Sequence, residues 1–217
     1  IEITQNNYDD YFYKFDGQIK PESGIVAGDI LKIGNISDRG FVIDRQLTLM
    51  PLDNTSKISN GFIHLVKGSD GSTVSGLTIN NTKGSLSING IYVSQLHGIW
   101  ITKSNNNTIE NLNIRNNIIR IAYAAGVYAM PMGWSSYNRI IGNDMSTYFT
   151  CVMVMGQCHY NLISKNRLET LDYSDEIVSN LIYFNPFGHA DYSGPALCVG
   201  NIISDNYLKA FCNGVMS

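Results

Sequence analysis

The sequence predicts a right-handed parallel β-helix, an all-β solenoid built from strand rungs of unequal length, and not a doubly wound or helical enzyme domain. Three observations favour this fold class: the composition, a repeated strand phrase, and the uneven spacing of that phrase. Of the 217 residues, 44% are hydrophobic and only 15% are charged. Asn, Ser, Thr, Gly and Tyr fill the places that Lys and Glu take in helical proteins, which favours strands and tight turns.

The repeated phrase has an Asn or Ser, an apolar residue two positions later and another apolar residue seven positions later. Internal repetition of this kind is typical of solenoids, in which each repeat stacks on the next. The intervals between the five copies are 35, 31, 23 and 40 residues, too irregular for ankyrin or leucine-rich repeats but acceptable for a β-helix. The copies begin at Ser72, Asn107, Asn138, Asn161 and Asn201.

A second phrase, a short strand of apolar, large and apolar residues, precedes these copies. Strands this short bury their apolar side chains only when successive units stack, with about 4.8 Å between rungs. Asn at the corners tolerates left-handed backbone angles and can form side-chain ladders from coil to coil. The second phrase occurs as Ile63-His64-Leu65, Ile99-Trp100-Ile101, Val127-Tyr128-Ala129, Val152-Met153-Val154, Ile182-Tyr183-Phe184 and Val215-Met216, and Ile91-Tyr92-Val93 is expected on a neighbouring sheet of the same coil.

The chain reads as one continuous domain, because no linker rich in Pro, Gly or Ser divides it. We expect residues 1–60 to form an N-terminal cap and first coil, with a short helix at Asn7–Phe12, and residues 61–217 to form the β-helix rungs. Within the first part, residues 1 to about 25 are expected to cover the first rung. Residues 214–217 begin another rung with no capping element after it. This predicts a fragment of a longer protein, truncated at its C-terminus, or an end that pairs with another chain.

The charge pattern argues against several partners. A net charge of -3 with only 15 Lys and Arg residues provides no basic face for nucleic acid. The chain has no run of 18 apolar residues, so no membrane span is predicted.

The four cysteines match no zinc-binding spacing, so we expect them to be small buried core residues and we expect no cofactor or metal. A disulfide between Cys198 and Cys212 remains an open alternative. The cysteines are Cys151, Cys158, Cys198 and Cys212.

Two turn-and-strand phrases, residues 68–77 and 105–111, resemble those of the pectate-lyase-like β-helix superfamily. Within that superfamily the chain resembles the adhesin-like surface proteins of methanogenic archaea, whose modules begin with an Asn- and Tyr-rich helical segment similar to residues 6–12, followed by a strand similar to residues 28–31. The resemblance covers nearly the whole chain. It implies an extracellular protein at a cell surface, but it does not fix an activity, because β-helices host lyases, hydrolases, epimerases and binding modules.

A catalytic cluster is not expected. A lyase needs a Lys or Arg base and often calcium held by carboxylates, and a polygalacturonase-like hydrolase needs aspartates on adjacent rungs. Gly188-His189-Ala190 resembles a hydrolase turn but has no aspartate partners. The charged residues next to strands are scattered one per rung: Lys103, Arg115, Arg120, Arg139, Lys165 and Arg167, with Glu110, Asp144 and Glu169.

The strongest site signal is a predicted column of outward side chains, His64, Trp100, Tyr128, Met153, Tyr183 and Met216, with Tyr92 beside it. Aromatic faces at this spacing suit sugar rings or an apolar protein surface. The simpler interpretation is that sheets favour aromatics and that a loop covers them. A strand shifted by one residue would also turn the column inward. The residues predicted to bind a ligand are Trp100, Tyr128, Tyr183, Tyr92, Trp134 and His189.

The leading functional hypothesis is therefore a non-enzymatic cell-surface adhesion module that binds carbohydrate or a surface protein of another cell. The alternative is a polysaccharide lyase or related carbohydrate-active enzyme that works in a groove of the β-helix. That alternative would gain from a Lys or Arg within hydrogen-bond reach of an acidic residue on the next rung. A third hypothesis is a structural spacer.

Overall fold

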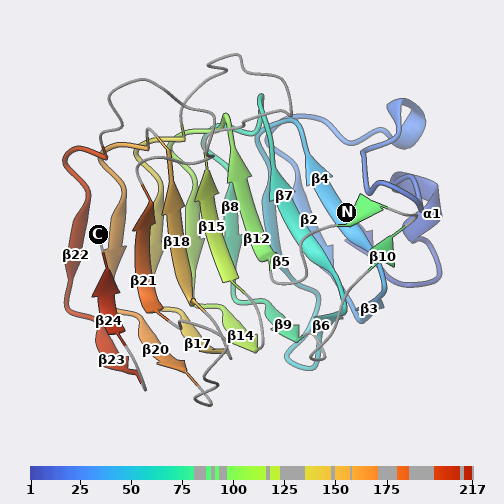
Figure 1. Ribbon diagram of the computed structural model, residues 1–217. Helices are drawn as coiled ribbons and strands as arrows, with labels where there is room; N and C mark the ends of the chain where they lie inside the picture. Colours follow the sequence, from blue (N-terminus) through green and yellow to red (C-terminus); the bar gives the residue numbers. More distant parts are fainter. Residues whose placement is uncertain are drawn as a thin grey trace.

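A computed structural model describes residues 1–80, 87–88, 91–92, 97–115, 118–122, 135–147, 150–156, 158–170, 180–185, 198–210 and 213–216. Within these residues the chain is an all-β solenoid in which three parallel sheets enclose one core (Figure 1). The predicted parallel β-helix is confirmed. No helix of the described residues is long and apolar enough to cross a membrane.

Each coil passes through the three sheets in the same order, and we number the sheets in that order. Sheet 1 contains β1 (Glu2–Ile3), β2 (Ile30–Ile33), β5 (Thr48–Pro51), β8 (Thr73–Ser75), β13 (Thr108–Glu110), β16 (Arg139–Ile141), β19 (Leu162–Ser164) and β22 (Ile202–Ser204). Sheet 2 contains β3 (Ile36–Ser37), β6 (Lys57–Ser59), β9 (Thr78–Asn80), β14 (Asn113–Arg115), β17 (Asp144–Thr147), β20 (Arg167–Thr170) and β23 (Tyr207–Lys209). Sheet 3 contains β4 (Gly40–Ile43), β7 (Phe62–Leu65), β12 (His97–Thr102), β15 (Ile118–Ala122), β18 (Val152–Met155), β21 (Asn180–Asn185) and β24 (Asn213–Met216).

The core consists of apolar columns that run along the solenoid, one or two from each sheet. Because the pairing is parallel and in register, an apolar residue of one strand lies against its counterpart on the next rung, and burying each such side chain contributes about 1.5–3 kcal/mol. On sheet 1 the column runs Leu31, Leu49, Val74, Ile109, Ile140, Ile163 and Ile203. On sheet 2 it runs Ile36, Ile58, Ile79, Ile114, Met145, Leu168 and Leu208.

Two ladders of asparagine side chains hold the corners of successive rungs together. In each, the Oδ1 atom of an Asn accepts a hydrogen bond from the backbone N–H of the rung before it, which satisfies buried groups that a sheet cannot reach. The residue that precedes a ladder Asn has a positive φ, as at Asn106 (58°) and Gly142 (67°), so the left-handed position and the ladder position are adjacent. The first ladder links Ser72, Asn107, Asn138, Asn161 and Asn201, and the second links Leu112, Asn143, Asn166 and Asn206.

A third ladder runs beside the first one in the opposite direction. Here a side chain accepts from the backbone N–H of the rung after it, so the two ladders together join each rung to both neighbours. The chemistry of the acceptor changes along the series, from carboxylate to amide, hydroxyl and imidazole. The acceptors are Asp70, Asn105, Ser136 and the Nδ1 atom of His159, whose donors are Asn105, Ser136, His159 and Val199.

The N-terminal end of the solenoid carries the helix α1 (Tyr8–Tyr11) and the 3₁₀ turn η1 (Pro21–Ser23) (Figure 1). The predicted short helix is therefore present. Tyr8, Phe12 and Phe41 form a buried aromatic cluster with ring centroids 5.1–5.4 Å apart, which packs α1 against β4 of the first rung. The Tyr8 hydroxyl donates to the Gly40 carbonyl, and burial raises the pKa of Tyr8 well above its usual range.

Two predicted positions in the sheets are corrected. On sheet 3 the register passes from Trp100 through Arg120 to Met153, so β15 holds the position that the sequence assigned to Tyr128, which lies outside the described residues. Strand β11 (Ile91–Tyr92) pairs antiparallel with β10 (Ser87–Ile88) in a separate two-stranded sheet. The prediction that Tyr92 lies on a neighbouring sheet of the same coil is therefore wrong, because β11 belongs to none of the three sheets.

Candidate functional site

The predicted column follows one register line of sheet 3, in which Arg120 stands at the position predicted for Tyr128. In register it runs Val42, His64, Trp100, Arg120, Met153, Tyr183 and Met216. Side chains Trp100 and Tyr183 are half-buried, neither enclosed in the core nor fully open to solvent. They lie three rungs apart, about 14 Å along the solenoid at the spacing of parallel strands.

The first two rings of the column stack on each other. The rings of His64 and Trp100 are 4.3 Å apart and within 6° of parallel, and His64 Nε2 lies 2.8 Å from the Thr102 hydroxyl. Neighbouring strands lie about 4.8 Å apart, so this stacking turns the ring faces along the solenoid axis and leaves ring edges at the surface. The expectation that free aromatic faces point outward is wrong for this pair.

Of the other predicted binding residues, the structure places only the backbone of Tyr92. Tyr128, Trp134 and His189 lie outside the described residues, and Tyr92 belongs to the antiparallel pair. Tyr128 and Trp134 fall in the connection between β15 and β16, and His189 falls in the connection between β21 and β22. Both connections start at a strand of sheet 3.

Long connections are concentrated at the two edges of sheet 3. Between sheets 1 and 2 the corner is short: Glu110 ends β13 and Asn113 begins β14, and the same two-residue corner recurs on later rungs. By contrast, sheet 3 strands are bounded by the long segments 81–96, 123–138, 171–179 and 186–201. Segments between strands carry function more often than the scaffold that holds them, so sheet 3 is the face on which a ligand site is sought first.

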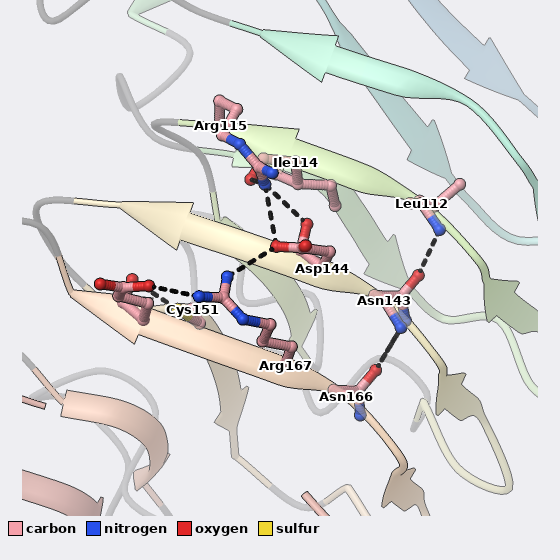
Figure 2. Close-up of polar contacts among 9 residues, drawn as sticks. Leu112, Ile114, Arg115, Asn143, Asp144, Cys151, Asn166 and Arg167 are labelled. Atoms are coloured by element: carbon pink, nitrogen blue, oxygen red, sulfur yellow. Dashed lines mark hydrogen bonds and ion pairs between the residues drawn. The ribbon is translucent and has the colours of Figure 1, made fainter. Parts of the chain in front are cut away.

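A second cluster lies on the outer face of sheet 2 and joins four rungs, and Figure 2 shows the part that contains Arg115, Asp144 and Arg167. Asp144 Oδ1 lies 3.2 Å from Arg115 Nη1 and 3.4 Å from Arg167 Nη1. Arg167 also pairs with Glu169 at 2.9 Å, and Lys209 lies 2.5 Å from the other oxygen of Glu169. The expectation that the charged residues are scattered one per rung is therefore wrong for this cluster, because stacking brings cations and carboxylates of successive rungs into contact.

The electrostatics of this cluster favour the ionised form of Glu169. The hydrogen bond from Lys209 and its positive charge hold the pKa of Glu169 below its ordinary value, and Glu169 raises the pKa of Lys209 in return. A glycosidase acid must stay protonated near neutral pH, which requires the opposite shift. The geometry therefore supports an ion-pair ladder between rungs more strongly than a hydrolytic acid and base.

Sequence reasoning missed Lys209 and the pairing of the cluster, although a signal was present. Aligning the five repeats on their ladder residues places one outward column six positions later and another eight positions later. The first column reads Thr78, Asn113, Asp144, Arg167 and Tyr207, and the second reads Asn80, Arg115, Ser146, Glu169 and Lys209.

The remaining candidates lie elsewhere. Arg139 points outward on sheet 1, while Lys103 and Lys165 occupy positive-φ corner positions at 54° and 56°. Cys151 and Cys158 are buried, as expected, and burial raises the pKa of Cys151 to about 12. Across the part of the chain that the structure describes, no three His, Cys, Asp or Glu residues lie together as metal ligands would.

No protein-family profile and no curated protein sequence matches the chain. Among solved structures, the chain is similar to the catalytic domain of a GH87 α-1,3-glucanase, solved as a single-residue variant in complex with tetrasaccharides. The TM-score is 0.58 at 16% identity, over 87% of this chain and 32% of that chain. The chain thus spans about a third of the length of that solved protein, and the likeness shows the fold. By fold, the protein is a parallel β-helix protein.

Proposed function

We propose that the chain is a non-enzymatic carbohydrate-binding β-helix module that works outside the cell, at a cell surface, with its ligand along the outer face of sheet 3. The observation that carries this proposal is the register line on that face in which the half-buried side chains of Trp100 and Tyr183 lie three rungs apart. A glycan laid along the solenoid axis would cross these rungs in turn.

Two further observations support this face. Its edges carry the long connections, which include Trp134 and His189. The fold neighbour was solved with tetrasaccharides bound, so a β-helix of this kind is compatible with an oligosaccharide ligand. Since the His64 and Trp100 rings stack on each other, contact with sugar would use ring edges, the Arg120 position and polar groups as well as the ring of Tyr183.

The test is a glycan-array screen followed by affinity electrophoresis on the polysaccharides that score. Trp100→Ala and Tyr183→Ala should each weaken binding by about tenfold or more, as expected for aromatic anchors at the centre of an interface. Tyr207→Ala is the matched control, because Tyr207 is an exposed aromatic on sheet 2. All variants are first compared with the parent by circular dichroism and thermal unfolding. Equal loss in the control, or unchanged binding in both test variants, would refute the placement on sheet 3.

The second candidate function is a polysaccharide lyase or related carbohydrate-active enzyme. It is favoured by the contacts of Arg115 with Asp144 and of Lys209 with Glu169, which join cations to acidic residues of neighbouring rungs. Its test is release of unsaturated or reducing sugars from pectin, alginate, chondroitin and α-1,3-glucan. Product that disappears in Asp144→Asn and Glu169→Gln would replace the binding proposal with this one.

A further inference from the structure

A column of small side chains lines the corner that leads into sheet 1. Each member stands three residues before a residue of the first ladder, so the members of consecutive rungs are equivalent. In the column, Ser69 Oγ and Ser104 Oγ lie 2.8 Å apart, which shows that side chains here meet across the gap between rungs. The column reads Ser69, Ser104, Ser135, Cys158 and Cys198.

The last two members are cysteines on neighbouring rungs. The offset of 40 residues between them equals the offset of the hydrogen bond from Asn161 to Asn201, and the strands that follow pair in the same register. The Tyr160 N–H also donates to the Val199 carbonyl at 2.9 Å. In-register rungs place equivalent Cα atoms about 4.8 Å apart, inside the range of roughly 4.4–6.8 Å that a disulfide spans.

The two thiols already lie against the same short segment. Cys158 Sγ is 3.2 Å from the Met155 carbonyl, and Cys198 Sγ is 2.7 Å from the Gly156 carbonyl. The Cys198 side chain therefore reaches from its own rung to the corner of the rung that contains Cys158. Bonding the two sulfurs requires rotation of side chains and no change of register.

We propose that Cys158 and Cys198 are an oxidation site that forms a disulfide between neighbouring rungs when the protein meets a low-molecular-weight disulfide. The half-buried Cys198 thiol, as thiolate, attacks the small disulfide and releases one small thiolate. The Cys158 sulfur then attacks Cys198 Sγ and releases the second. Two electrons pass from the cysteines to the small disulfide, and the two cysteine protons end on the two small thiols.

The bond would close a loop that contains β19, β20 and β21, and it would tie the last sheet 1 rung of the described chain to the one before it. The contribution of a disulfide to stability grows with the size of the loop it closes. Since burial raises the pKa of the Cys198 thiol, the first attack should be slow at neutral pH and faster at pH 8.5.

The experiment is to incubate the full chain with oxidised glutathione, block free thiols, and map the linked peptides by mass spectrometry without reduction. The expected result is a peptide pair joined through Cys158 and Cys198, with a rise in the unfolding temperature of about 5 °C that reductant reverses. Cys151→Ser should keep both the linked peptide and the shift. Cys158→Ser should lose both, and serine at the three preceding rungs indicates that this variant folds.

Two outcomes would overturn the proposal. One is a bond between Cys198 and Cys212, the alternative open from the sequence. The other is the absence of any linked peptide after prolonged incubation at pH 8.5 while the chain stays folded. Neither outcome depends on carbohydrate binding, so this proposal and the proposed function fail separately.

Discussion

The side chain of one ladder asparagine makes hydrogen bonds with several buried groups at once. The Oδ1 atom of Asn138 accepts from the backbone N–H and the side-chain amide of Asn107, at 3.0 and 2.9 Å, and its own amide donates to Asn161 and to the Ser104 carbonyl. Asn138 is fully buried, so water cannot replace these partners. Losing one such side chain would leave several buried polar groups without hydrogen-bond partners, which lowers the free energy of unfolding.

Replacing the Asn138 side chain should therefore destabilise the fold strongly. We expect Asn138→Ala to lower the free energy of unfolding by about 3 kcal/mol, because the Asn107 N–H and the Ser104 carbonyl lose buried partners. The control is Asn113→Ala at an exposed outward position of β14, which should change it by less than about 0.5 kcal/mol. Urea unfolding followed by circular dichroism measures both, and equal effects would contradict the ladder's role.

Glycine provides a second test at the residue scale. Gly68 has a φ of 100°, and a Cβ there would overlap the Asp44 carbonyl, whereas Gly24 has a φ of 74° and open space around it. Gly68→Ala should cost about 3 kcal/mol, from backbone strain and the overlap together. Gly24→Ala should cost only about 1 kcal/mol from the left-handed backbone. Thermal unfolding of the two variants separates steric overlap from backbone strain, and an equal loss in both would show that the overlap costs nothing.

At the scale of elements, the outer ladder of sheet 2 makes stability depend on pH. The folded-state pKa of Glu169 is lower than its unfolded value, so its contribution is present above the unfolded pKa of about 4.3 and is lost as pH falls through the folded value. The parent should therefore be more stable than Glu169→Gln at pH 7, and the difference should shrink toward pH 3. Urea midpoints at both pH values measure this; a constant difference would mean that the ion pairs with Lys209 and Arg167 do not stabilise the fold.

The strands of the three sheets could be predicted from the sequence to different extents. The five repeats predicted strands of sheets 1 and 2 well, because a ladder Asn and two inward apolar residues are the physical requirements of each rung. Sheet 3 was harder, since β15 has Arg120 at the register position between Trp100 and Met153, where the apolar, large, apolar pattern predicted an aromatic residue. Outward positions are free to vary, so patterning cannot identify them. The ion pairs of Asp144 needed the rung register, which single charges do not reveal.

At the scale of the whole molecule, each rung contacts only its neighbours, so stability should be distributed along the axis. We expect Leu208→Ala in β23 to speed amide hydrogen exchange of residues 202–209 by at least about tenfold, while β2 to β7 keep their protection. Leu49→Ala in β5 should do the reverse. Hydrogen exchange followed by mass spectrometry resolves these segments. Uniform loss of protection in either variant would instead indicate one cooperative unit.

The first ladder has a consequence for how such a protein can change in length. The backbone N–H of Asn107, Asn138 and Asn161 each donates to the Asn side chain of the next rung, so the contacts made by Asn138 and Asn161 are interchangeable. Removing residues 138–160 would bring Asn107 against Asn161 with an equivalent hydrogen bond restored. The solenoid can therefore be lengthened or shortened by whole rungs, as by duplication or loss of a gene segment, without redesign of its corners.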